Sequence, residues 1–326
     1  MKLYNYLFLA MMMFGTMIVL SSNSWFSIWM GLEINLLAFI PLINKNFNLL
    51  STEASLKYFL VQALASSILL LGMIFFMCNS NMNTNLIYNL ALLLKMGSAP
   101  FHFWLPSVSE GLDWFNLFIL LSWQKIAPFV TIFINLNYYL IVLSIVLTSL
   151  MGAIGGLNQT SLRKIMAYSS VNHLGWMLFA IMNSKMMWIF YIVIYTMILG
   201  LMSTTFYLIN SFYLNQLMFS FKNVLIKFFI FTNFLSLGGL PPFLGFLPKW
   251  MVLENYLMGS PILMVFMVMM TIISLNYYLR MMFFSFTINN MNLNLISKFN
   301  YNYFLFFSMF NLMVGFLILF FIFMLF

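Results

Sequence analysis

The sequence predicts an all-α polytopic membrane protein, and three of its features support that fold class. Hydrophobic residues make up 64% of the 326 residues and charged residues only 6%, whereas soluble domains carry about a quarter charged residues. Nearly every window of about 19 residues is apolar enough for a membrane-spanning helix. The longest polar connection covers only residues 286–301. We therefore expect residues 1–326 to form a single transmembrane domain.

The apolar runs between Asn, Ser, Lys and Pro punctuation predict about 11 transmembrane helices. The first run follows a lysine, Lys2, but no small-residue cleavage site comes after it, so we interpret it as a retained span rather than a signal peptide. The predicted spans lie near residues 3–21, 24–43, 54–78, 85–106, 112–134, 138–157, 162–182, 186–210, 222–256, 260–285 and 302–325.

The distribution of basic residues predicts how the chain is oriented. An odd number of spans places the two termini on opposite sides of the membrane. If the N-terminus is inside, the outer connections carry only Lys185, which agrees with the positive-inside rule. The inner connections and helix ends then carry Lys2, Lys45, Lys57, Arg163, Lys164, Lys222, Arg280 and Lys298.

Several functional classes are excluded by composition. The single cysteine, Cys78, cannot form a disulfide or a four-cysteine iron–sulfur site within the chain. The formal charge of +8 comes from scattered residues that form no basic patch, so we expect no nucleic-acid partner. The glycine-rich segment 152–158 ends a predicted span, which argues against a phosphate-binding loop. We expect no redox catalytic residue, cofactor site or metal site on this chain.

Ionisable side chains occur at mid-depth in several predicted spans. Glu33, Lys95, Lys125 and His173 each lie about ten to thirteen residues into a span, near the middle of a core about 30 Å thick. Lys249 follows a break in the ninth span. An isolated charged lysine at that depth costs about 2.5–3.5 kcal/mol. We predict that the charged groups face a hydrated interior and carry protons or ions, while His173 suits a relay and a packing role equally.

The other ionisable residues have simpler interpretations. Long basic side chains near helix ends can extend, or snorkel, to the membrane interface. Carboxylates near the surface can be solvated or can pair with a lysine one helical turn away. We assign packing, snorkelling, paired or interfacial roles to His102, Glu53, Lys57, Glu110, Asp113, Glu254 and Arg280.

Two spans are interrupted by glycine and proline. The segments LLLKMGSAPFHFWLP (92–106) and SLGGLPPFLGFLPKW (236–250) fall in spans four and nine. Such breaks free backbone groups that hydrocarbon cannot satisfy. Because an offset of five spans reverses direction, the pair predicts two inverted five-helix repeats, an arrangement typical of transporter pathways. The expected repeats are about 1–134 and 138–285, with an extra C-terminal helix at about 302–325.

Five segments resemble one known family: KMGSAPFHFWLP, SWQKIAP, TEASLKYFL, RKIMAYSSVNHLGW and GGLPPFLGFLPKW. They are similar to the NADH:ubiquinone oxidoreductase chain 2 family, the mitochondrially encoded antiporter-like subunits of respiratory complex I. The resemblance covers about residues 24 to 256. It implies a proton-translocating membrane-arm core subunit, driven by electron transfer from NADH to ubiquinone elsewhere in the complex.

The resemblance also implies a location, partners and cofactors. It places the chain in the mitochondrial inner membrane, with the N-terminus in the matrix and the C-terminus in the intermembrane space. The implied partners are other membrane-arm subunits, including other antiporter-like subunits, and lipids. The holoenzyme is implied to use NADH, FMN, iron–sulfur clusters and ubiquinone, none of them bound by this chain.

Roles for individual residues follow from the same resemblance. Glu33 matches the family's ion-pair carboxylate, and Lys95 matches the lysine that pairs with it. Lys125 matches a central lysine between two half-channels, and Lys249 matches the lysine at the second break. His173 falls in the relay region. A Glu–Lys pair about 4 Å apart contributes about 4 kcal/mol at an effective dielectric of about 20. That is the scale needed to move one charge against ~180 mV.

Three other functions remain open from the sequence. A stand-alone cation/proton antiporter would carry similar charged spans. A structural membrane-arm subunit without its own proton path is a second alternative. A quinone-site subunit is less favoured, because no cluster of titratable residues marks one membrane surface.

Overall fold

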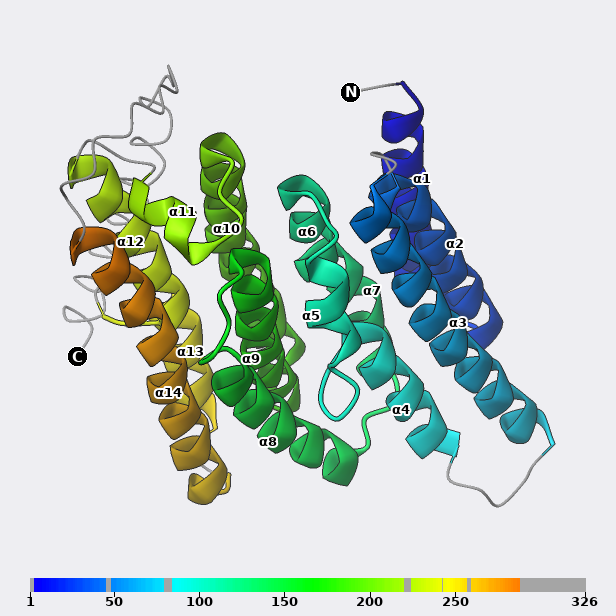
Figure 1. Cartoon of the computed structure of the whole chain (residues 1–326). Coiled ribbons are helices and arrows are strands. Elements are labelled where there is room, and N and C mark those ends of the chain that lie inside the picture. Colours follow the sequence, from blue (N-terminus) through cyan, green and yellow to red (C-terminus); the bar gives the residue numbers. More distant parts are fainter. Residues whose placement is uncertain are drawn as a thin grey trace. The chain divides into compact units, whose positions relative to one another are not determined.

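The computed structural model describes residues 3–44, 48–78, 84–219, 224–241, 243–256 and 259–287, and of residues 3, 217–219, 224–230 and 284–287 it describes the backbone alone. Within these ranges the chain forms fourteen helical segments (Figure 1). Eight helical stretches in this part are long and apolar enough to cross a membrane. The predicted all-α, multi-span class is therefore confirmed.

Seven predicted spans are single helices. Each forms because an uninterrupted apolar run satisfies its own backbone hydrogen bonds, which hydrocarbon requires. They are α1 (Leu3–Ser21), α2 (Trp25–Ile43), α3 (Leu49–Met77), α8 (Tyr138–Gly155), α9 (Leu162–Asn183), α10 (Lys185–Ile209) and α14 (Pro261–Thr287).

Three predicted spans are divided into two helices each. The expected breaks separate α4 (Thr84–Met96) from α5 (Trp104–Ser109) and α12 (Val224–Gly238) from α13 (Phe246–Asn255). A further division at Ser122, which was not predicted, separates α6 (Trp114–Leu121) from α7 (Trp123–Ile132). A short helix, α11 (Leu214–Phe219), was also not predicted. The eleventh predicted span lies outside the described residues, so the count of eleven stays a prediction.

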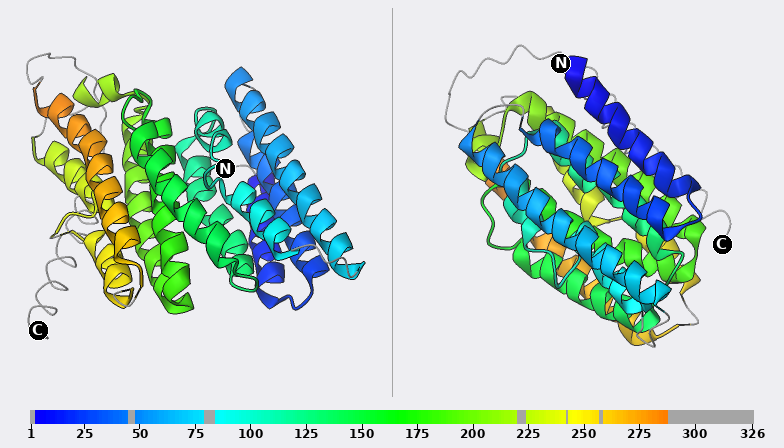
Figure 2. Two further views of the ribbon diagram at one scale, coloured as in Figure 1. Left: turned by 90° about the horizontal axis from the view of Figure 1, so that it is seen from below. Right: turned by 90° about the vertical axis from the view of Figure 1, so that its right-hand side faces the viewer.

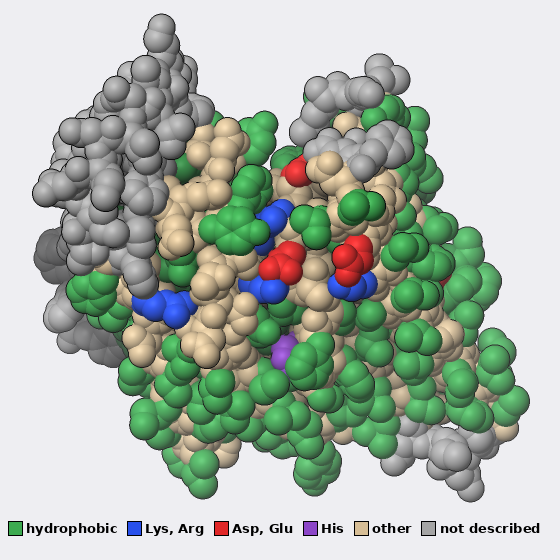
Figure 3. Space-filling model, viewed as in Figure 1, with side chains coloured by type: hydrophobic (Ala, Val, Ile, Leu, Met, Phe, Trp, Pro, Cys, Tyr) green, Lys and Arg blue, Asp and Glu red, His purple; other side chains and the backbone are tan. Residues whose placement is uncertain are grey.

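The chain divides into two compact units, residues Met1–Thr148 and Ser149–Phe326. The first unit contains α1–α7 and the first break, and the second contains α9–α14 and the second break. In the first unit α1, α2 and α3 lie side by side (Figures 1 and 2). Hydrophobic side chains cover much of the face seen in Figure 3, as a lipid-facing protein requires.

Close packing of α1 on α2 fixes the helix that carries Glu33. A Cβ added at Gly15 would lie 3.0 Å from the Gly31 carbonyl oxygen, and one added at Gly31 would lie 2.8 Å from that of Gly15. Small residues let membrane helices approach this closely. Both glycines therefore set the position of α2 relative to its neighbours.

Helix α9 is the most enclosed of the described spans, because 89% of the residues in its most apolar stretch are buried inside the protein. It contacts α10, α13 and α14 within the second unit. Because it is surrounded by protein, its polar residues Ser169, Ser170, Asn172 and His173 are shielded from lipid. This explains why α9 can cross a membrane although its mean hydropathy is the lowest of the eight candidate membrane-spanning helices.

Two basic residues near helix ends behave differently. Lys57 pairs with Glu53 at 2.6 Å on an exposed surface, as expected for neighbours one turn apart. Arg280 reaches the connection between α8 and α9, and its placement at the membrane interface stays a prediction. Its guanidinium donates to the carbonyls of Leu157 and Gln159, the latter at 2.9 Å, because the end of α8 offers acceptors within reach.

Candidate functional site

The first break ends α4 through a compact glycine motif. Gly97 has a φ of 72°, a left-handed conformation that favours glycine. Its N–H donates to the Leu94 carbonyl at 3.2 Å, and the N–H of Ser98 donates to the Leu93 carbonyl at 3.1 Å. This pair of bonds is a Schellman motif, which terminates the helix within one residue.

Neutral side chains donate to two of the carbonyls at the end of α4. The indole N–H of Trp104 donates to the Leu94 carbonyl at 3.2 Å, and the amide of Gln62, from α3, donates to the Lys95 carbonyl at 3.1 Å. Buried helix ends need such partners. The ammonium group of Lys95 is consequently not required to cap its own helix.

The second break repeats the same backbone design. Gly239 has a φ of 77°, and its N–H donates to the Ser236 carbonyl at 3.1 Å while Leu240 donates to Leu235 at 3.3 Å. The pattern GxxPFxxxLP occurs at both breaks, at residues 97–106 and 239–248. The sequence analysis recognised the two breaks but missed this residue-by-residue correspondence.

At the second break a buried lysine caps the interrupted helix. Lys249, in α13, is 6% exposed, and its Nζ donates to the Gly238 carbonyl at 2.6 Å. The C-terminal end of a helix carries partial negative charge, so α12 favours a cation at this position. Nζ also lies 5.9 Å from the centroid of the Trp176 ring. The tertiary structure thus assigns Lys249 a structural bond that the sequence did not reveal.

We expect Gly239→Ala to destabilise this end of the second unit. A left-handed φ costs a non-glycine residue about 1–2 kcal/mol. The added Cβ would also lie 2.8 Å from both Cδ and Nζ of Lys249. The assembled fraction on native gels, together with its heat resistance, measures the effect. Gly200→Ala, in the continuous helix α10, is the control, and equal loss in both variants contradicts the packing argument.

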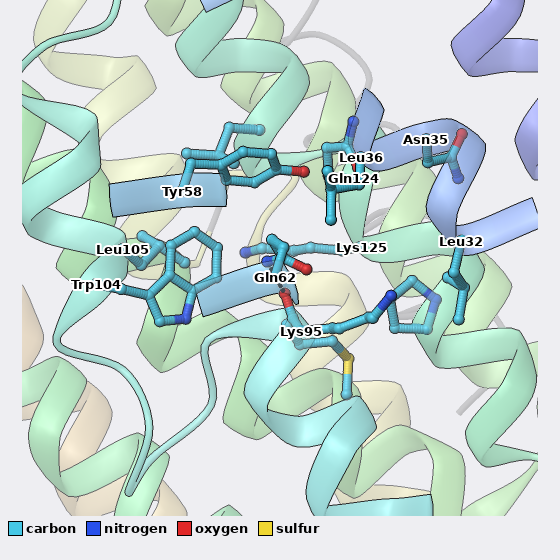
Figure 4. A pocket seen from close by; sticks show the side chains of 13 residues that line it. Leu32, Asn35, Leu36, Tyr58, Gln62, Lys95, Trp104, Leu105, Gln124 and Lys125 are labelled. Carbon is cyan, nitrogen blue, oxygen red and sulfur yellow. Dashed lines mark hydrogen bonds between the residues drawn. The ribbon is translucent and has the colours of Figure 1, made fainter. Parts of the chain in front are cut away.

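In the first unit, Lys95 and Lys125 line one small cavity (Figure 4). They come from α4 and α7 and are 6% and 2% exposed. The volume that the centre of a water molecule can occupy in this cavity is about 20 Å³. By the same measure one ordered water needs about 10–15 Å³, so the cavity can hold a water molecule. The other polar lining residues are Asn35, Tyr58, Gln62 and Gln124.

Glu33 lies beside this cavity without forming a contact ion pair. Its neighbour on α2, Leu32, lines the cavity, and its carboxylate interacts electrostatically with Lys95 and Tyr58. Among the described residues, however, no ion pair within 4.0 Å joins Glu33 to Lys95. One carboxylate oxygen of Glu33 is buried with no hydrogen-bond partner. The expected pair is therefore present as neighbours, in an open arrangement.

The two histidines occupy different buried positions. His173 Nδ1 lies 2.8 Å from the Tyr191 hydroxyl, and its ring centroid lies 4.9 Å from that of Tyr195. Both partners come from α10, so they could not be found from the sequence around His173. His102 is 2% exposed within the first break, against Phe103 at 4.2 Å between ring centroids.

The structure brings together Lys95 and Lys125, with Glu33 nearby, while Lys249 and His173 belong to the second unit. Sequence reasoning missed the neutral cavity residues on α3. A signal for them was present, because Ser55, Tyr58 and Gln62 follow helical spacing on one buried face. In the described part of the chain, no three His, Cys, Asp or Glu side chains cluster as a metal site would require.

Fold and site together define a class: a polytopic helical membrane protein with two discontinuous helices and buried lysines at their breaks, the architecture of ion-translocating proteins. A family model for the transmembrane region of NADH:quinone oxidoreductase and Mrp antiporters matches residues 22–274. The chain belongs to this family.

Curated relatives agree with the resemblance seen in the sequence. NADH-ubiquinone oxidoreductase chain 2 of Anopheles gambiae is 50% identical over 311 residues, covering 92% of this chain and 91% of the relative. The chain of the same name from Aedes aegypti is 49% identical over 298 residues, which cover 88% of this chain and 87% of the relative. The Bos taurus chain is 39% identical over 283 residues, covering 82% of each.

Solved structures share the fold. A chain of respiratory complex I from Thermus thermophilus, solved with bound aureothin, superposes with a TM-score of 0.84 at 24% identity, covering 97% of this chain and 78% of its own length. A chain of the Mrp complex from a Dietzia species superposes with a TM-score of 0.75 at 18% identity. The match covers 84% of this chain and 59% of the Dietzia chain.

Proposed function

We propose that this chain is a proton-translocating membrane-arm core subunit of NADH:ubiquinone oxidoreductase, complex I. It is a multi-pass protein of the mitochondrial inner membrane, and electron transfer from NADH to ubiquinone elsewhere in the complex drives it. The relatives named chain 2, at 39–50% identity, support this function. The proposed pathway uses Glu33, Lys95, Lys125 and Lys249, with His173 as a candidate relay.

The observation that carries the proposal is the cavity shared by Lys95 and Lys125. Because both lysines line one water-sized space, water can carry a proton between them: the ammonium of one lysine donates to water, and water donates to the amine of the other. Buried lysines are costly in a membrane and mark ion pathways when they occur. Tyr58, Gln62 and Gln124 supply polar groups that can orient the water.

Glu33 provides the switch in this pathway. When its carboxylate approaches Lys95, the attraction favours a proton on the lysine; when it withdraws, burial favours release. A contact near 4 Å is worth about 4 kcal/mol at an effective dielectric of about 20. We assign the open arrangement of Glu33 and Lys95 to the releasing state of this proposed cycle.

Lys249 receives the proton after Lys125 in the proposed pathway. Its bond to the Gly238 carbonyl stabilises the charged ammonium at the end of α12. Release of the proton weakens that bond, so transport through Lys249 is linked to the geometry of the second break. His173 and Trp176 are three residues apart on α9 and so share one helix face, and Lys249 Nζ lies 5.9 Å from the Trp176 ring centroid, which makes His173 the candidate relay.

The remaining parts of the assignment follow from the family. We place the N-terminus in the matrix and the C-terminus in the intermembrane space, as the basic residues favour. The two breaks, built alike and one in each unit, support two inverted repeats. Other membrane-arm subunits and lipids surround the chain, while NADH, FMN, iron–sulfur clusters and ubiquinone act elsewhere in the holoenzyme.

Glu33→Gln tests the switch directly. Glutamine keeps the shape but removes the charge, so we expect proton translocation by the assembled complex to fall at least about tenfold. Dye-reported acidification of proteoliposomes, normalised to assembled complex, measures it. Glu53→Gln removes an exposed carboxylate instead and is expected to leave translocation unchanged. Full translocation by an assembled Glu33→Gln complex contradicts the switch, and cation/proton exchange by the isolated chain in liposomes would favour a stand-alone antiporter.

A further inference from the structure

The second unit contains a cluster of buried hydroxyls that the pathway described above does not use. We define the hydroxyl cluster as six residues from α9, α10 and α14, each 3% exposed or less. Hydroxyl groups are costly to bury unless they have partners. Phenylalanine and alanine would fill the same space without that cost, so the repeated hydroxyls need an explanation. The hydroxyl cluster consists of Ser169, Ser170, Tyr191, Tyr195, Tyr277 and Tyr278.

One end of the hydroxyl cluster lies beneath the connection between α8 and α9. A Cβ added at Gly156, in that connection, would lie 2.9 Å from the Tyr277 ring. Arg280, three residues further along α14, binds the carbonyls of Leu157 and Gln159 in the same connection. Tyr277 is therefore the member of the cluster nearest to this end of the second unit.

From Tyr277 the cluster continues inward through closely placed polar groups. The rings of Tyr277 and Tyr278 are 4.4 Å apart between centroids, and their hydroxyls are electrostatic neighbours. The Tyr278 hydroxyl neighbours Ser169. Ser274, next to Tyr277, accepts from the Asn172 amide at 3.1 Å. These contacts join α14 to α9.

The cluster then reaches the middle of α9. The Tyr195 hydroxyl neighbours Ser170, and the Tyr195 ring centroid lies 4.9 Å from that of His173. His173 contacts the Tyr191 hydroxyl at 2.8 Å. Because Ser169 and His173 are four residues apart, this segment advances about 6 Å along the helix axis.

Beyond His173 the same face of α9 leads to Lys249. Residues three apart on a helix are neighbours, which places Trp176 beside His173. Lys249 Nζ lies 5.9 Å from the Trp176 ring centroid. The polar groups therefore run from the α8–α9 connection, past His173, to the surroundings of Lys249.

Buried polar atoms along this line include three that have no hydrogen-bond partner within 3.5 Å in the protein. They are the Tyr277 hydroxyl, the Asn172 side-chain oxygen and the Trp176 indole nitrogen. Buried polar atoms without protein partners are usually satisfied by ordered water. Such waters would close the gaps between neighbouring hydroxyls that lie beyond direct hydrogen-bond distance.

On this geometry we propose that the hydroxyl cluster, with His173, conducts protons between Lys249 and the end of the second unit where Arg280 lies. Ser169 and Ser170, whose hydroxyls donate to the Met166 and Ala167 carbonyls at 2.7 Å, turn toward the neighbouring tyrosines as the proton passes. Each hydroxyl then accepts a proton from one neighbour as it donates its own to the next. No O–H bond is lost overall, and no tyrosine remains ionised. The inference rests on the proposed function, and it names a route for proton exchange with Lys249 that does not pass through the first unit.

Tyrosine-to-phenylalanine variants test the route, because they remove one oxygen and keep the ring. We expect Tyr278→Phe and Tyr195→Phe to lower proton translocation per assembled complex at least about threefold and to raise its solvent deuterium isotope effect. Tyr88→Phe is the matched control, because Tyr88 is a tyrosine of the first unit, 1% exposed and outside the hydroxyl cluster. Should Tyr278→Phe assemble poorly, Ser169→Ala removes the neighbouring hydroxyl with a smaller change.

The outcomes separate this inference from the proposed function. If the cluster only packs, Tyr278→Phe, Tyr195→Phe and Ser169→Ala translocate like Tyr88→Phe, and the inference is overturned. Lys249→Met is measured alongside them. If Lys249→Met loses translocation while the hydroxyl variants keep it, only the route is wrong. If Lys249→Met translocates normally, the proposed function itself fails.

Discussion

Lys125→Met is expected to abolish proton translocation while leaving the membrane arm assembled. Methionine has a similar length but cannot hold a proton, so the exchange with Lys95 across their shared cavity is interrupted. We expect a loss of at least about a hundredfold, the scale typical of a proton-transferring group. The measurement is acidification of proteoliposomes by the purified complex, normalised to assembled protein.

Stability and transport are expected to change in opposite directions in this variant. Lys125 is 2% exposed, and a charged lysine deep in a membrane costs about 2.5–3.5 kcal/mol. Removing it should leave assembly and heat resistance equal to the parent or better. A structural role for Lys125 predicts the reverse, with impaired assembly and an unchanged number of protons moved per electron. Lys57→Met, at an exposed surface position, controls for loss of a positive charge.

Lys249→Met is expected to lose both transport and stability, which distinguishes it from Lys125→Met. The substitution leaves the Gly238 carbonyl without its charged donor at 2.6 Å. A hydrogen bond to a charged group contributes about 1.5–3 kcal/mol. We therefore expect reduced heat resistance of the assembled complex in addition to a loss of translocation of at least about tenfold.

Lys249→Arg separates the two roles of this side chain. A guanidinium can donate to the Gly238 carbonyl, so the cap on α12 and the heat resistance are expected to be largely restored. Arginine does not release its proton in proteins, so translocation is expected to remain as low as in Lys249→Met. Normal translocation by Lys249→Arg would show that Lys249 acts by position and charge alone, without exchanging a proton.

Much of the fold was accessible from the sequence because it depends on local composition. Apolar runs long enough to cross hydrocarbon predict helices, and α1, α2, α9 and α10 begin and end within about two residues of prediction. Both helix breaks were also predicted from Gly and Pro. The division at Ser122 and the short α11 were missed, because neither carries a glycine or proline at the point of interruption.

The candidate site was only partly accessible. Glu33, Lys95, Lys125 and Lys249 were selected because ionisable groups at mid-depth are costly, and that cost can be read from position alone. Their partners could not be read in this way. Tyr58 and the hydroxyl cluster are aromatic or small polar residues whose types are common in any membrane helix, so only their mutual placement sets them apart.

By itself, the sequence determined the membrane class, most helix boundaries, the two interruptions and the buried charges, because each depends on residues adjacent along the chain. The tertiary structure decided that Lys95 and Lys125 share a cavity, that Glu33 lies apart from Lys95, and that Lys249 caps α12. Those outcomes depend on how helices distant in the sequence rotate and pack against one another. Side-chain partners across helices follow from that packing, which no local pattern encodes.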